Sequence, residues 1–142
     1  MAAFGWQVWA LLSAVFAALT AILAKVGVED VDPDVATFVR TLVIVVVLGA
    51  LLLVTGQKIG VVPARAYLFL TLSGLATGAS WLCYFRALSL GDAAQVAPLD
   101  KLSVVLVAIF AVIFLGERLS MRDVAGIALI TVGAILVATG RA

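Results

Sequence analysis

Five stretches of this chain are each long and apolar enough to cross a membrane as a helix. A hydrocarbon core of about 30 Å requires about 20 apolar residues in helical form. The stretches are Trp6–Ala24, Val35–Thr55, Ala66–Phe85, Ala93–Gly116 and Val124–Gly140. Their apolar residues are continuous rather than alternating, which argues against a membrane β-barrel. We therefore expect an all-α integral membrane protein with five transmembrane helices, surrounded by lipid bilayer.

The composition excludes an ordinary water-soluble domain. Hydrophobic residues make up 65% of the 142 residues, charged residues 12%, and the mean hydropathy is +1.30. Soluble domains contain about 45–50% apolar and about 25% charged residues. We expect one transmembrane domain over residues 1–142. A cleaved export signal is not expected, because Met1–Gly5 has no basic residue and the first apolar stretch is long enough to span.

Several classes of function lack the residues that they need. The chain has no histidine and one cysteine, Cys83, which excludes an intrachain disulfide and leaves a metal site unsupported. The net charge of +1 does not favour nucleic-acid binding, and the phosphate-binding loop of ATPases is absent. We expect no cofactor and no enzyme. The nearest catalytic pair, Ser103 with Lys101, leaves an intramembrane hydrolase as the least favoured alternative.

Ionisable residues close to or inside the predicted spans are the first candidates for a solute site. Such groups are costly in a membrane and usually face a protein interior or a cavity. Alternation of the spans places five of them near the same side of the membrane: Lys25, Arg40, Arg86, Asp100 and Lys101. We predict a solvated vestibule that favours anionic or zwitterionic solutes, with Asp100 as a proton-exchange group. The alternative is that the basic side chains extend to the lipid headgroups and that Asp100 only pairs with one of them.

Aromatic residues give a second set of candidates on the third span. Thr77, Trp81 and Tyr84 are spaced to share one helical face, where rings can stack on a solute. The alternative is that these aromatic residues belong to the aromatic belt at the membrane–water interface, and Tyr84, near the end of the span, fits that interpretation. Pro98, shortly before Asp100, either loosens the backbone for movement or is a tolerated proline near a helix start.

Glycines mark surfaces where helices can approach closely. Gly74 and Gly78 are four residues apart in the third span, and Gly126, Gly133 and Gly140 recur every seven residues in the fifth. Such patterns favour helix association in membranes. The fifth span is therefore a candidate subunit interface, with packing inside the chain as the equal alternative.

Several blocks of sequence resemble the EamA domain of the drug/metabolite transporter superfamily. These are Arg86–Leu88, Val96–Leu99, the FLGERLS block Phe114–Ser120, and the glycine pattern from Gly126 to Gly133. The resemblance covers nearly the whole chain and implies one five-helix repeat, half of a ten-helix transporter. It implies a prokaryotic inner-membrane protein that exports or exchanges small metabolites. Relatives that export cations carry an acid in the first helix, which this chain lacks between Met1 and Ala24.

A single repeat suggests that two copies work together. Transporters often bind solute between two repeats of inverted topology. Basic residues are nearly balanced between the two sides, with Lys58, Arg65, Arg118 and Arg122 on one side and Lys25, Arg40, Arg86, Lys101 and Arg141 on the other. This weak bias permits dual topology. We expect a secondary transporter of small polar metabolites that works as a homodimer, antiparallel if both orientations occur; the alternative is a membrane scaffold or subunit that needs a different partner.

Overall fold

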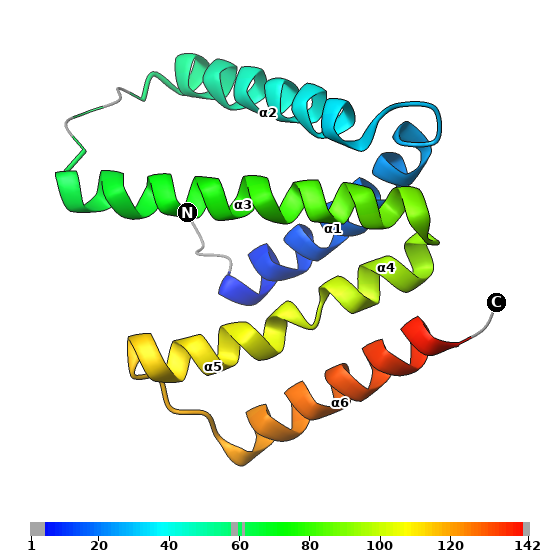
Figure 1. Ribbon diagram of the computed structural model, residues 1–142. Coiled ribbons are helices and arrows are strands. Elements are labelled where there is room, and N and C mark those ends of the chain that lie inside the picture. Colours follow the sequence, from blue (N-terminus) through cyan, green and yellow to red (C-terminus); the bar gives the residue numbers. More distant parts are fainter. Residues whose placement is uncertain (1–4, 58–59, 61, 141–142) are drawn as a thin grey trace. The chain divides into compact units, whose positions relative to one another are not determined.

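The computed structural model describes residues 5–57, 60 and 62–140 (Figure 1). Lys58 and Arg141, which contribute to the charge balance above, lie outside the described residues. The helices are α1 (Trp6–Gly27), α2 (Pro33–Thr55), α3 (Ala64–Leu90), α4 (Ala93–Asp100), α5 (Ser103–Leu115) and α6 (Met121–Thr139). No strand occurs in this described part, and α4 with α5 makes up one apolar stretch, Ala93–Leu115. Five helical stretches are long and apolar enough to span a membrane, which confirms the expected fold class.

The apolar side chains of these stretches are mostly exposed on the chain. Only 6–11% of the residues in each stretch are buried. In water this exposure would be unfavourable, because apolar surface is stabilised by removal from water. The exposed leucine, valine and phenylalanine side chains are therefore the surface that faces lipid.

Local sequence signals fix both ends of α2. Asp32 precedes the helix, and its Oδ1 accepts hydrogen bonds from the backbone N–H groups of Asp34 at 2.9 Å and Val35 at 3.3 Å. Pro33 occupies the first helical turn, where its missing N–H costs no helical hydrogen bond. Gly56 ends the helix at φ 65°, a left-handed conformation that glycine adopts without strain.

The turn before α6 is also defined by capping. Gly116 ends α5 at φ 67°, and the backbone N–H of Glu117 donates to the Ala111 carbonyl at 3.1 Å. Ser120 and Asp123 then form a reciprocal capping box at the start of α6. The charged residues Glu117 and Arg118 of the FLGERLS block thus lie at a structural turn between two helices.

Two helices extend past the boundaries expected from hydropathy. α1 continues beyond Ala24 to Gly27, and α3 continues beyond Phe85 to Leu90. Lys25 and Arg86 therefore lie within helices rather than after them. The reason is that a charged side chain does not end a helix by itself; helix ends depend on capping and on chain-breaking residues.

The chain forms two compact units. One is Leu23–Leu90, which contains α2 and α3 lying side by side (Figure 1). The other combines Met1–Ile22 with Gly91–Ala142, in which α6 packs against α4 and, less extensively, against α5. Each unit brings together its own set of the polar residues identified above.

The fourth span is interrupted rather than continuous. Between α4 and α5, the backbone N–H groups of Lys101 and Leu102 donate to the carbonyls of Pro98 and Leu99, each at 3.0 Å. These are three-residue rather than four-residue hydrogen bonds, so one tight turn joins two helices. Pro98 lies in α4, and because it has no N–H the Ala94 carbonyl lacks its usual helical partner.

Candidate functional site

The most distinctive polar contact in a predicted span is that between Arg40 on α2 and the aromatic residues of α3. The Arg40 Cζ lies 4.0 Å from the centre of the Trp81 ring and 5.5 Å from that of Phe85. Tyr84 lies on α3 between Trp81 and Phe85 and interacts electrostatically with Arg40. Seven helical rises separate Arg40 from Pro33, which places it about 10 Å along α2. This arrangement holds a half-buried cation against rings well inside a membrane-spanning helix.

The Arg40 guanidinium makes a cation–π contact with the Trp81 ring. A guanidinium has five N–H donors in its plane and no acceptor. In the part of the chain that the structure describes, no group accepts a hydrogen bond from Arg40, whose ring contacts are with Trp81 and Phe85.

Lys25, near the end of α1, has a different role. Its Nζ donates a 2.8 Å hydrogen bond to the Leu88 carbonyl in the last turn of α3, and the Leu88 side chain is fully buried. The last carbonyls of a helix have no helical partner and carry the negative end of its dipole, so a lysine there is stabilising. Lys25 thereby joins the end of α1 to the end of α3.

Arg86 is paired with an acid that sequence reasoning did not select. Its Nη2 lies 2.8 Å from Oδ2 of Asp34, in the first turn of α2. Both side chains are exposed, at 64% and 49%, so solvent screens the pair and it contributes little to stability. Its consequence is electrostatic, because Asp34 neutralises Arg86, and no acid among the described residues pairs with Arg40.

Asp100 and Lys101 lie in the other unit. Lys101 Nζ is 3.0 Å from Oδ2 of Asp100, and the two residues mark the tight turn between α4 and α5. Lys25, Arg40 and Arg86 belong to Leu23–Leu90 with Trp81 and Tyr84, and the Asp100–Lys101 pair belongs to the second unit. That these residues line one vestibule stays a prediction. The predicted role of Asp100 in proton exchange stays a prediction.

The glycines predicted to mediate packing have open surroundings. A Cβ atom added at Gly74, Gly78, Gly126 or Gly133 would meet nothing within 4 Å. On α6 the less exposed residues are Gly126, Ile127, Thr131, Ala134 and Ala138. Gly133 is exposed and next to buried Ala134, so it points about 100° away from that residue. Gly133 therefore lies beside the face of α6 that packs within the chain, whereas Gly126 is itself half-buried.

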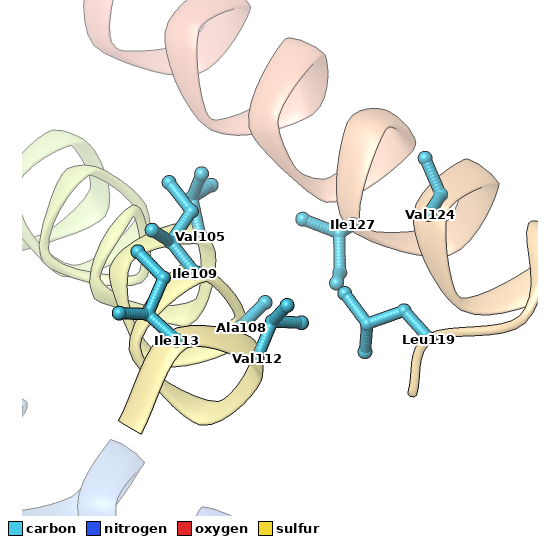
Figure 2. Close-up of a pocket in the computed structure, with 8 residues that line it drawn as sticks. All are labelled: Val105, Ala108, Ile109, Val112, Ile113, Leu119, Val124 and Ile127. Carbon is cyan, nitrogen blue, oxygen red and sulfur yellow. The ribbon is translucent and has the colours of Figure 1, made fainter. Parts of the chain in front are cut away.

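A groove between α5 and α6 is entirely apolar. It has a volume of about 310 Å³ (Figure 2), and its lining residues are Val105, Ala108, Ile109, Val112, Ile113, Leu119, Val124 and Ile127. In Figure 2, Ala108 and Val112 from α5, Ile127 from α6 and Leu119 from the connecting turn point into the space between the helices. Because no polar group lines it, this groove is suited to hydrocarbon rather than to a polar solute.

Sequence reasoning missed two residues of the α2–α3 site, and each had a signal. Phe85 follows Trp81 by four residues and therefore shares its helical face. Asp34 is the acid in the first turn of α2, one turn and a half before Arg40. The register of α2 against α3, which pairs these residues, has no such signal in the sequence.

Comparison with known proteins agrees with the helical pattern. Residues 4–139 match the EamA-like transporter family. A Sinorhizobium protein named "Uncharacterized transporter in cobO 3'region" is 62% identical over 135 residues, which cover 94% of this chain and 96% of the relative. No solved structure matches the chain. This match of nearly the whole chain, with its five membrane-spanning stretches, shows that the protein belongs to the EamA-like transporter family.

Proposed function

We propose that this protein is a secondary transporter that exports or exchanges small polar metabolites, anionic and zwitterionic ones in particular. The observation that carries this proposal is the Arg40 guanidinium, held 4.0 Å from the Trp81 ring with its N–H edge unused in the described chain. A charged group inside a membrane helix is costly and typically marks a solute or ion pathway. The family match supports transport but does not specify the solute.

We further propose that the working unit is a homodimer that operates by alternating access. A single five-helix repeat needs a second repeat to enclose a solute between them. The open surroundings of exposed Gly133, beside the intrachain face of α6, support α6 as the contact between copies. The near balance of basic residues supports an antiparallel pair in the prokaryotic inner membrane.

The interrupted fourth span supports a moving part. Transporter sites commonly use discontinuous helices, whose free backbone groups face a cavity. Asp100 lies at this interruption and is paired with Lys101 at 3.0 Å. A carboxylate that exchanges a proton there would couple solute movement to the proton gradient.

Solute efflux from liposomes that contain only this protein tests the proposal. The liposomes are loaded with a mixture of small carboxylates, amino acids and neutral polyols, and the released solutes are identified by mass spectrometry. We expect selective release of carboxylates or amino acids relative to protein-free liposomes. No release of any solute would reject autonomous transport; restoration by a second membrane protein would then favour the subunit alternative.

Orientation tests the antiparallel arrangement separately. In a Cys83→Ala background, Lys58→Cys is labelled in intact cells with a membrane-impermeant maleimide. We expect about half of the molecules to be labelled and the remainder only after lysis. Complete or absent labelling in intact cells would mean a single orientation and reject the antiparallel dimer.

A further inference from the structure

The guanidinium of Arg40 offers two chemically different surfaces, and the fold uses one of them. Its Cζ lies over the Trp81 ring, 4.0 Å from the ring centre, and 5.5 Å from the centre of the Phe85 ring. Its edge carries N–H donors with matched spacing for two oxygens of one carboxylate. Leaving such donors without acceptors inside a membrane span is unfavourable, because buried polar groups are stabilised only when they are hydrogen-bonded. The ring contacts hold the cation beside α3 without supplying a hydrogen-bond acceptor in the plane of a carboxylate.

The acids of the same unit are engaged elsewhere or lie outside the span. Asp34 holds Arg86 at 2.8 Å, and Asp32 caps the start of α2. Glu29 and Asp30 are exposed in the turn between α1 and α2. Within Leu23–Leu90, therefore, the edge of Arg40 is not occupied by a carboxylate of the chain.

We propose that Arg40 binds the carboxylate of a small solute that carries one carboxylate group, through its N–H edge, while Trp81 holds its face. This inference rests on the proposed transport function and defines the recognised group of the solute. The class includes simple monocarboxylates and amino acids, which share this group.

Charge favours a single carboxylate over a dianion. Arg86 is neutralised by Asp34, and the Lys25 ammonium is held at the Leu88 carbonyl, at the end of α3. Arg40 thus has no acidic partner among the described residues, while the Lys25 ammonium donates to a neutral carbonyl at the end of α3. One guanidinium compensates one negative charge, and a second charge in a poorly solvated site would remain uncompensated. A planar carboxylate also matches the guanidinium fork better than a point contact with a tetrahedral anion does.

Fluorescence of Trp81 gives a direct assay of binding. The chain has three tryptophans, and Trp6 and Trp9 are highly exposed in α1, so Trp6→Phe with Trp9→Phe leaves Trp81 as the reporter. The full chain in nanodiscs of zwitterionic lipid is titrated at constant ionic strength with acetate, its neutral analogue acetamide, and sulfate. We expect a saturable change with acetate and a response at least about tenfold weaker with acetamide, because a hydrogen bond to a charged group is lost. Sulfate is also expected to bind more weakly than acetate. These titrations need no substitution at Arg40. The proposal would be wrong if the three probes gave equal responses, if sulfate bound more tightly than acetate, or if acetate gave no response.

Substitutions then locate the response. Arg40→Lys keeps the charge but removes the planar fork, and we expect acetate binding to weaken about tenfold or more. Arg65 provides a matched control, since it lies at the other end of α3 with its Cζ 6.0 Å from the Phe69 ring. Arg65→Lys should leave the titration unchanged. Equal effects of the two substitutions, or no effect of Arg40→Lys in a folded chain, would contradict the assignment.

A lipid headgroup could also accept hydrogen bonds from Arg40, and nanodiscs of different lipid composition test this. Solute efflux is measured in a separate experiment. If nanodiscs with anionic phosphatidylglycerol change the Trp81 signal and acetate does not, Arg40 binds a headgroup and the proposal is wrong. Selective carboxylate efflux that persists in Arg40→Lys also overturns the inference but leaves the proposed function intact. If acetate binds but no solute is released from liposomes, carboxylate binding at Arg40 is supported and transport by this protein alone is rejected.

Discussion

Replacing Gly133 with leucine should weaken association between copies of the chain without destabilising the folded chain itself. A Cβ added at Gly133 meets nothing within 4 Å, so the larger side chain fits the isolated chain without a clash. Glycine inside a helix is less favourable than a good helix former by about 0.8–1 kcal/mol. We therefore expect the folded chain to be stabilised by up to that amount, or at least not destabilised.

The same substitution should weaken the proposed dimer. Helices that associate in membranes approach closely through small residues, and an added isobutyl group would separate them. Insertion of extra methylene groups into a packed contact typically costs about 1–3 kcal/mol. At the dimer contact this cost would raise the dissociation constant about 5- to 150-fold. The two expected effects therefore have opposite signs.

Energy transfer between labelled copies in liposomes measures association, and thermal unfolding in detergent measures chain stability. Gly49→Leu is the matched control, because Gly49 lies inside α2 and its added Cβ also meets nothing within 4 Å. We expect loss of energy transfer in Gly133→Leu and not in Gly49→Leu, with unfolding temperatures equal to or above that of the unmodified chain. Intact association of Gly133→Leu would place the interface elsewhere, and loss of stability would show that Gly133 packs within the chain.

Two further predictions concern coupling and packing. Asp100→Asn should reduce proton-driven efflux about tenfold or more. Asp92→Asn is the control, because Asp92 lies at the start of α4 and its side chain makes no capping bond. Unchanged efflux in Asp100→Asn would exclude Asp100 as the coupling group. Leu88→Ala should destabilise the chain by about 2 kcal/mol, the lower end of the range for buried leucines, because lipid already solvates apolar groups. Leu90, which is 90% exposed in the same helix, is its control, and similar unfolding temperatures for the two alanine variants would contradict the assigned burial.

The fold class could be predicted from the sequence because a bilayer permits few solutions. Each long apolar stretch must satisfy its backbone polar groups internally, and a helix does so with local hydrogen bonds. The same local character makes the ends of α2 and α6 readable, through Asp32 with Pro33 and through Ser120 with Asp123. Hydropathy alone does not define where α1 and α3 end as helices, because lysine and arginine are compatible with a helix and both helices continue past Lys25 and Arg86.

The candidate site was predictable only in its residue types. Arg40, Trp81 and Tyr84 were selected because charged and amphipathic side chains are unusual at membrane depth. Their partners were not predictable, since contacts such as Arg86 with Asp34 join residues 52 positions apart. The interruption after Asp100 likewise depends on backbone hydrogen bonds at Lys101 and Leu102 that the nearby Pro98 does not specify.

The sequence by itself therefore determined that the chain is helical, crosses a membrane and carries polar residues suited to a solute pathway. These properties depend on local composition and on hydrogen bonds between residues close in the chain. The tertiary structure decided how the charges are partnered: it paired Asp34 with Arg86, placed the Lys25 ammonium at the Leu88 carbonyl, and placed Arg40 against the Trp81 ring. The physical reason is that these contacts depend on the rotation and register of neighbouring helices. Apolar helix surfaces can pack in many rotations and registers, and hydropathy does not distinguish among them.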